Sequence, residues 1–575
     1  MFHKQQLLKN SDYICPRMGK RAIICIAFLF TGYFISAQAV NTAPGVAYAQ
    51  LINRYRVLEG KTSDTLHTSF APHSRNDLRY TLSGWETKYT RSVDKFNMQY
   101  LHQDNWELVD SLPKSKNPVF KHFYQIPSAF YHVNHPGFSL NINPVLHFSG
   151  GRETGNDELL YVNTRGIEVR STIDDKVSFY TYIGENQLFV PQYVVSRVKT
   201  TQAIPHEGFW KDFKGTGYDF FNIRGYISFN ATRHINVQFG QDRFKAGQGM
   251  RSLILSDYAP SYPFLKLNTK VWKFSYTNLF TQFTQDLVSA GSGLSGTTGF
   301  PVKYMAFHHL SLNIGKKFNL GFFESVMYGA PDGERARIEV KYLNPVIFYR
   351  AVEHQNGSTD NVILGMDAEW IIHKGIALYG QLILDEFYLK YLKEGNGWWA
   401  NKYGIQAGIN YYNVAGVDNL DLTTEFNTVR PYTYSHYTPY GSYSHYRQPL
   451  AHPLGANFKE VAASLRYQPL PRLSLTGKVI LAGYGQDTTG VNWGGNILMD
   501  NRTKVQVNGN FTGQGIYTRL SYVSFKAAYM LKHNLFLDAS ALLRREESEL
   551  ALFSNNTKVF GIALRLNIAD RLHEF

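Results

Sequence analysis

From Phe138 to the C-terminus, apolar and polar residues alternate with a period of two, and this pattern constrains the fold more than any other feature. The clearest stretches are residues 362–371, 419–428 and 535–545, each with one apolar and one polar face. Side chains of a β-strand point alternately to the two faces of a sheet, so the pattern predicts strands that are apolar on one side. A soluble β-sandwich would alternate too, so the pattern alone leaves that alternative open.

The lengths of the connections distinguish these alternatives, because short turns alternate strictly with nine longer loops. We expect the turns at 174–175, 232–233, 277–278, 315–317, 373–374, 413–418, 469–471 and 532–533, and the loops at 149–158, 187–221, 244–264, 288–302, 330–361, 388–401, 429–458, 485–514 and 546–556. This asymmetry is typical of outer-membrane barrels, which have tight periplasmic turns and long outer loops. We therefore predict an all-β fold: a single 18-stranded antiparallel transmembrane outer-membrane β-barrel with a small N-terminal, partly helical periplasmic segment.

The N-terminal residues have the features of an export signal. Two basic residues precede the apolar stretch 22–30, and small residues follow it. We predict a cleaved signal peptide at 1–39, a periplasmic or plug segment at 40–136, and the outer-membrane barrel with long extracellular loops at 137–575. Helical spacing is evident only near the start of the second segment, at 40–60.

Three further features of the sequence bear on chemistry and on binding partners: the cysteines, the net charge and the C-terminal residue. Cys15 and Cys25 both lie in the predicted leader, which excludes thiol catalysis and cysteine-metal sites in the mature chain. The net charge is +14, but the basic residues are scattered, which favours a solvated surface over nucleic-acid binding. The chain closes on Phe575, and a terminal aromatic residue predicts that the C-terminal strand engages the barrel-assembly machinery. The bilayer of the outer membrane is the other expected partner.

The inward face of the predicted barrel carries charged residues. They are Asp367, Glu369, Asp421, Glu425, Asp538, Arg544 and Arg565. An 18-stranded barrel is wide enough for an aqueous lumen. Solvated residues that pair among themselves are the favoured interpretation, and a selectivity ring is the alternative. The sequence does not tell whether residues 40–136 lie beneath the barrel or plug it.

The predicted outer loops are rich in aromatic residues, above all the loop 429–458. Sugars stack their C–H faces on aromatic rings while their hydroxyls meet polar side chains, so such a loop suits glycan capture. The candidate glycan-binding residues are Tyr432, Tyr434, His436, Tyr437, Tyr443, His445, Tyr446, Arg447, His452, Trp398, Trp399 and Arg350. Packing of the loops against one another is an alternative for the tyrosines, and an interfacial belt is one for the tryptophans.

Enzymatic functions are disfavoured by strand geometry. His309 and Ser311 share a strand face in a manner reminiscent of outer-membrane phospholipases, but that face is the polar one, which points into the lumen. Asp385 and Glu386 are adjacent on a strand, so they point to opposite faces and cannot act on one glycosidic bond. The histidines are too scattered for a metal site. We expect no catalytic residues, no metal and no cofactor.

Several stretches resemble a known family. They are HTSFAPHSR (67–75), GQGMRSLILSDYAPSYPF (247–264), KYMAFHHLSLNIGKKFNLGFFES (303–325), YLNPVIFYRAVEHQNGSTDNVILGMD (342–367), YGQLILDEF (379–387) and QPLAHPLGANFKE (448–460). They are similar to the capsule-assembly Wzi family, and most of all to its Bacteroidetes branch, which includes the gliding-motility protein RemB. The resemblance implies an outer-membrane barrel with a small helical periplasmic part, which acts as a lectin that holds capsular polysaccharide on the cell surface.

These observations predict a non-enzymatic, lectin-like outer-membrane barrel that binds and anchors or organises capsular polysaccharide or exopolysaccharide, either anionic or neutral. Two alternatives remain open at this stage. One is a gliding-motility or surface-adhesion component of the RemB type, and the other is a passive porin-like channel.

Overall fold

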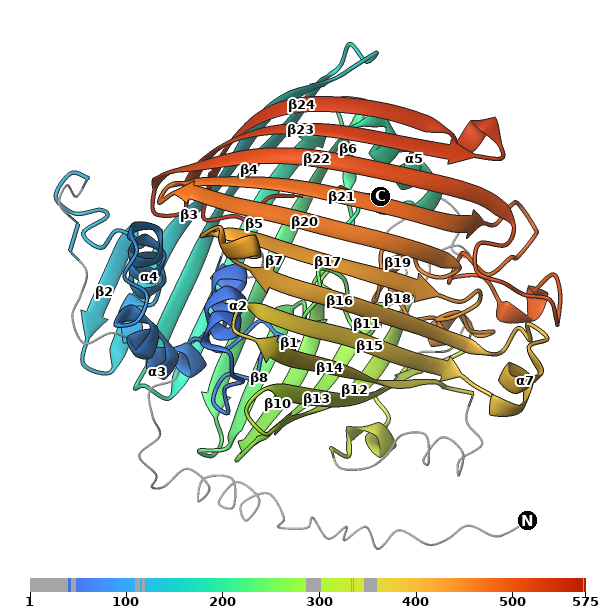
Figure 1. Cartoon of the computed structure of the whole chain (residues 1–575), viewed down its shortest axis with the longest axis horizontal. Helices are drawn as coiled ribbons and strands as arrows, with labels where there is room; N and C mark the ends of the chain where they lie inside the picture. The colour runs from blue at the N-terminus through green and yellow to red at the C-terminus, as the bar shows by residue number, and fades with distance from the viewer. Residues whose placement is uncertain are drawn as a thin grey trace, which may run out of the picture.

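The computed structural model of the chain describes residues 40–42, 48–108, 114–115, 119–285, 301–331, 334, 336–345, 359–571 and 573–575. Within this part of the chain, 18 antiparallel strands close into one barrel (Figure 1). The predicted fold class is thereby confirmed. The predicted signal peptide, residues 1–39, and Arg350 lie outside the described residues.

The barrel strands follow one another around the wall in chain order. They are β3 (Phe138–Glu153), β4 (Leu159–Ile173), β5 (Val177–Phe189), β7 (Gly217–Asn230), β8 (Ile235–Asp242), β10 (Tyr262–Val271), β11 (Phe274–Thr284), β12 (Val302–Ile314), β13 (Phe318–Tyr328), β14 (Asn361–His373), β15 (Ile376–Glu386), β16 (Lys402–Tyr412), β17 (Leu420–Val429), β20 (Phe458–Leu470), β21 (Leu473–Gln486), β22 (Ile516–Lys532), β23 (Leu535–Ser548) and β24 (Asn555–Leu566). The last strand, β24, pairs with β3. Closure removes the unpaired sheet edges that a bilayer cannot tolerate.

The two faces of each strand differ as the alternation predicts. On β14, Trp370 is 52% exposed on the outside, whereas Asp367 is 3% exposed and points into the lumen. On β24, Phe560 and Ile562 are likewise exposed on the outside, at 58% and 65%. An apolar outer surface on every side of a closed barrel is suited to contact with lipid and unsuited to water.

One predicted turn is wrong. Thr277 and Asn278 lie inside β11, and the turn that connects β10 to β11 is at Trp272 and Lys273, where Trp272 has a φ of 53°. Thr277 is an inward strand position, and its hydroxyl accepts a hydrogen bond from the Asn268 side chain at 2.9 Å. Two adjacent polar residues are typical of a turn, although here only Thr277 faces the lumen, and this composition explains the error.

Three helices cover part of the short-turn end of the barrel: α2 (Tyr48–Glu59), α3 (Arg75–Glu86) and α4 (Ser92–Asp104) (Figure 1). They share a small core that includes Ile52 and Leu101, both fully buried. Buried ion pairs join α2 to the wall, since Arg56 binds Glu369 through two hydrogen bonds of 2.7 and 2.5 Å and Arg54 binds Asp421. No helix in the described part of the chain is long and apolar enough to cross a membrane.

The chain after α2 also enters the lumen. The two-residue strand β1 (Phe70–Ala71) pairs with β9 (Lys245–Ala246), which belongs to the long loop between β8 and β10. Another short hairpin, β18 (Ser444–His445) with β19 (Gln448–Pro449), forms in the loop between β17 and β20. Loops from both ends therefore fill part of the interior.

The seven inward charges predicted from the sequence are all buried. Their expected pairing among themselves holds for Arg565, which binds Asp538. It is wrong for Glu369 and Asp421, because the arginines of α2 neutralise them instead. The alternation shows which side chains point inward, but it cannot show which loop or helix meets them there.

The C-terminal residues turn back into the barrel after β24 ends at Leu566. The Glu574 carboxylate pairs with Lys478 Nζ at 2.6 Å and with Arg251 Nη1 at 2.5 Å. The Phe575 ring is 5% exposed and lies 5.0 Å from the Arg251 guanidinium. The terminal aromatic residue is therefore not part of the last strand, and engagement of the barrel-assembly machinery by that strand stays a prediction.

Candidate functional site

The loop between β17 and β20, residues 430–457, folds down against the barrel interior. Tyr432, Tyr434 and Tyr443 are fully buried there. Their hydroxyls donate hydrogen bonds to the backbone carbonyls of residues 492, 253 and 254 at 3.0, 2.5 and 2.8 Å. These three candidate stacking rings are thus enclosed by protein, in agreement with the alternative that the tyrosines pack between loops.

The candidate histidines of this loop are buried as well. His445 is 2% exposed and its Nδ1 accepts the Thr284 amide at 3.0 Å, while His452 Nε2 lies 2.7 Å from the Glu460 carboxylate. Burial lowers the pKa of His445 to about 3 and that of His436 to about 4. His436 and His445 are therefore neutral at pH 7 and offer no positive charge to a glycan carboxylate.

The remaining described candidates keep part of their surface accessible: Tyr437, Tyr446, Arg447, Trp398 and Trp399 are half-buried. The two tryptophans come from the loop between β15 and β16, at the end of the barrel opposite α3 and α4 (Figure 1).

An aromatic cluster forms around the tryptophans; we call Tyr388, Tyr391, Trp398, Trp399 and Lys504 the outer aromatic cluster. The ring of Trp398 lies 4.3 Å from that of Tyr391, which is carried by α7 (Leu389–Glu394), and 4.9 Å from that of Tyr388. The Lys504 ammonium lies 4.2 Å from the centre of the Trp399 ring. Tyr388 is 53% exposed, so the cluster reaches the surface.

A second aromatic–cation pair joins the loop between β17 and β20, which carries Tyr437, to the loop that carries Lys504. The Arg502 guanidinium lies 5.1 Å from the centre of the Tyr437 ring and is bonded to Asp500 at 2.7 Å. The long loop between β21 and β22 thus supplies both cations, Arg502 and Lys504. The sequence does not identify these two cations, because nothing in one loop indicates which aromatic residues of another loop it meets.

The residues considered for catalysis have other roles. His309 Nε2 lies 2.5 Å from the Asp367 carboxylate, both side chains being almost completely buried inside the wall. Asp385 accepts the Tyr434 amide at 2.7 Å, and Glu386 pairs with Lys402 at 3.0 Å. The described residues contain no group of three or more histidines, cysteines or carboxylates that could hold a metal ion.

The fold is similar to that of a solved structure, although the sequence matches no known family. No protein-family model and no curated protein matches the sequence. Among solved structures, the chain is similar to Wzi, described as an outer-membrane protein involved in group 1 capsule assembly in Escherichia coli and as a carbohydrate-binding β-barrel. The TM-score is 0.54 at 12% identity, over 93% of this chain and 100% of that chain.

Weaker similarities are to two outer-membrane proteins of Pseudomonas aeruginosa. OccK8 (OprE) has a TM-score of 0.40 at 8% identity, over 75% of this chain and 97% of that chain. OprD has a TM-score of 0.41 at 9% identity, over 74% of this chain and 92% of that chain. The similarity to Wzi shows that the protein has the fold of a closed outer-membrane-type barrel.

Proposed function

We propose that this protein is a non-enzymatic outer-membrane barrel whose long loops bind a polysaccharide outside the cell and hold it at the surface. The observation that carries the proposal is the outer aromatic cluster, which puts aromatic faces and a lysine together at the long-loop end. Aromatic faces take the apolar faces of sugars, and cations take their carboxylates. The similarity to Wzi supports a role in capsule assembly.

The binding surface in this proposal is smaller than the sequence suggested. Trp398, Trp399 and Tyr437 contribute rings, while Lys504, Arg502 and the half-buried Arg447 contribute charge. The buried Tyr432, Tyr434 and Tyr443 contribute to binding indirectly, because their hydrogen bonds hold in place the loop that carries Tyr437. An acidic polysaccharide fits the cations better than a neutral one.

The test replaces Trp398 and Trp399 together with alanine in the native strain. We expect the polysaccharide retained on the cells to fall while the amount of folded barrel stays unchanged. Trp272→Ala is a matched control, because Trp272 is 72% exposed at a short turn at the other end of the barrel. Unchanged retention in the double variant would contradict the proposal.

The two alternative functions predict different results. A passive channel would give steady, large openings in planar bilayers, whereas filling of the lumen by loops and helices favours silence. A gliding or adhesion component would give defective spreading with normal polysaccharide retention after deletion of the gene.

A further inference from the structure

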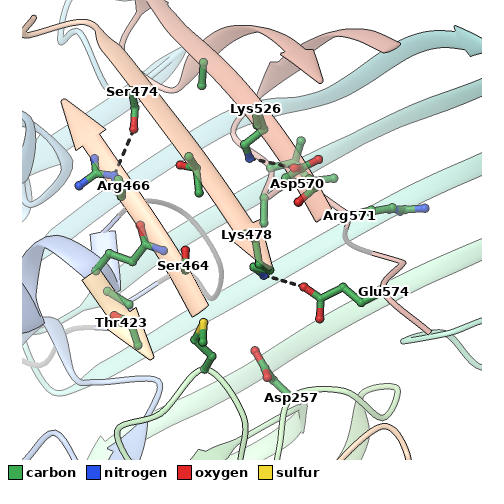
Figure 2. A pocket seen from close by; sticks show the side chains of 18 of the residues that line it. Asp257, Thr423, Ser464, Arg466, Ser474, Lys478, Lys526, Asp570, Arg571 and Glu574 are labelled. Carbon is green, nitrogen blue, oxygen red and sulfur yellow. Dashed lines mark hydrogen bonds and ion pairs between the residues drawn. The ribbon is translucent and has the colours of Figure 1, made fainter. Parts of the chain in front are cut away.

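The half of the barrel interior beside β20–β23 contains a cavity of about 850 Å³ (Figure 2). Its wall is rich in inward hydroxyls, which include Ser464 on β20, Ser474 and Thr476 on β21, and Ser524 on β22. The C-terminal residues form another side of it. We call this cavity the inner chamber. Its volume lies within the usual range for binding sites of small molecules.

The inner chamber reaches solvent at the short-turn end. Gln50 of α2 and Arg472 of the turn between β20 and β21 line it there, and both are exposed. At the other end it is lined by long-loop residues such as Ile204, Tyr258 and Pro453, which are buried. A ligand would therefore enter from the side of the short turns, which is the periplasmic side if the barrel has the usual orientation.

Most charges along the chamber are already balanced. Lys478 pairs with Glu574 at 2.6 Å, and Lys526 pairs with Asp570 at 2.8 Å, as the dashed lines in Figure 2 show. Asp257, at the long-loop end, is stabilised in its charged form by nearby Lys245, among other basic residues. These pairs need no ligand.

Two arginines of the chamber wall are not balanced in this way. Arg466 donates a hydrogen bond to Ser474 Oγ at 3.1 Å (Figure 2) and lies 4.0 Å from Asp421, a carboxylate that Arg54 of α2 already binds more closely. Arg571 donates to the amide oxygen of Asn186, its Nη1 has no hydrogen-bond partner, and within the described residues it has no carboxylate within 4.0 Å. In Figure 2 the Arg571 side chain points away from the two ion pairs. A half-buried guanidinium that no carboxylate contacts directly favours an anion or water beside it.

We propose that the inner chamber binds a short acidic saccharide, whose carboxylates meet Arg466 and Arg571 and whose hydroxyls bond to the serines and threonines of β20–β22. Arginine is suited to this task because its planar guanidinium can bind a carboxylate through two hydrogen bonds. The inner chamber shares no lining residue with the outer aromatic cluster. It does not depend on the function proposed for the outer loops.

The test uses the full-length mature protein, purified in detergent and titrated calorimetrically with trigalacturonate and, in parallel, with the neutral trimer maltotriose. We expect saturable binding of the acidic trimer and at least tenfold weaker binding of the neutral one. Arg571→Gln is expected to weaken binding of the acidic trimer by about tenfold, which is the effect of losing one charge-assisted hydrogen bond. Absence of binding, or equal binding of both trimers, would overturn the proposal.

Two further variants assign the binding to the chamber. Ser464→Phe puts a ring into the cavity without changing any charge, and we expect it to abolish binding even if Arg571→Gln folds poorly. Because the outer aromatic cluster can also bind an acidic sugar, the titration is repeated in the Trp398→Ala/Trp399→Ala variant, and we expect Ser464→Phe to abolish the saturable binding that remains there. If that variant removes binding and Ser464→Phe does not, the sugar binds the outer loops, and the chamber proposal fails while the proposed surface function stands.

Discussion

The two halves of the barrel interior differ in what their inward side chains meet. Along β10–β15 the inward residues include large apolar ones, for example Phe307 and Phe323, which pack against loop residues such as Leu253 and Tyr434. Along β20–β23 many inward residues are small and hydroxylated, and the inner chamber remains between them and the C-terminal residues. Figure 1 shows these strands on opposite sides of the barrel. The size of inward side chains thus separates a packed half from a hollow half within one closed sheet.

The packed half and the hollow half should differ most in how much the free energy of unfolding falls when an inward side chain is replaced with alanine. Phe307→Ala should lower the free energy of unfolding by about 3–5 kcal/mol, because Phe307 is fully buried and leaves a void among packed rings. Ser464→Ala in the hollow half should change it by less than about 0.5 kcal/mol, because its side chain borders the cavity. Denaturant unfolding of the two purified variants measures both values. Equal losses would mean that the two halves are packed alike.

A smaller difference is expected when the same ring is added to each half. Ser325 is fully buried in the packed half, and Ser325→Phe should destabilise the barrel by about 1–3 kcal/mol or more through overpacking. Ser464→Phe should be nearly neutral, since the chamber can hold the ring. The same unfolding measurement applies, and a destabilising Ser464→Phe would show that the chamber is not open space.

The smallest effect concerns pH and one buried histidine of the packed half. His445 has a folded pKa of about 3, below the 6.5 of an ordinary histidine, so between these values the unfolded chain binds a proton that the folded chain does not. The part of the unfolding free energy that comes from burying a neutral His445 is therefore fully present above pH 6.5 and is lost as the pH falls toward 3. Relative to His445→Asn, the wild type should lose about 1–2 kcal/mol of unfolding free energy between pH 7 and pH 5. An unchanged difference would contradict the burial of a neutral imidazole.

The comparison also shows which parts of the fold can be predicted from sequence. Asp367 and Trp370 could be assigned to opposite faces because a strand alternates strictly, and closure followed from the alternation of short turns with long loops. Thr277 was misplaced because a polar inward position resembles a turn. Phe575 could not be placed, since the path of the chain after β24 depends on contacts with Arg251, a residue far away in sequence.

The candidate site was predicted less well, for a related reason. The density of tyrosine in residues 429–458 indicated a special loop, but density cannot distinguish rings that face solvent from rings such as Tyr434 that fill the barrel mouth. The tryptophan pair at 398–399 was found, whereas Lys504 was not, because its contact with Trp399 joins two loops. Tertiary packing determines both which rings are buried and which residues of two different loops meet.

Direct binding tests the central claim, which is that the outer aromatic cluster holds a polysaccharide. The purified full-length barrel should bind the immobilised surface polysaccharide of its own cell, and Trp398→Ala/Trp399→Ala should weaken that binding by about tenfold, as expected for two lost stacking contacts. Trp272→Ala should bind like the wild type. Equal binding by the double variant and the wild type would contradict the account.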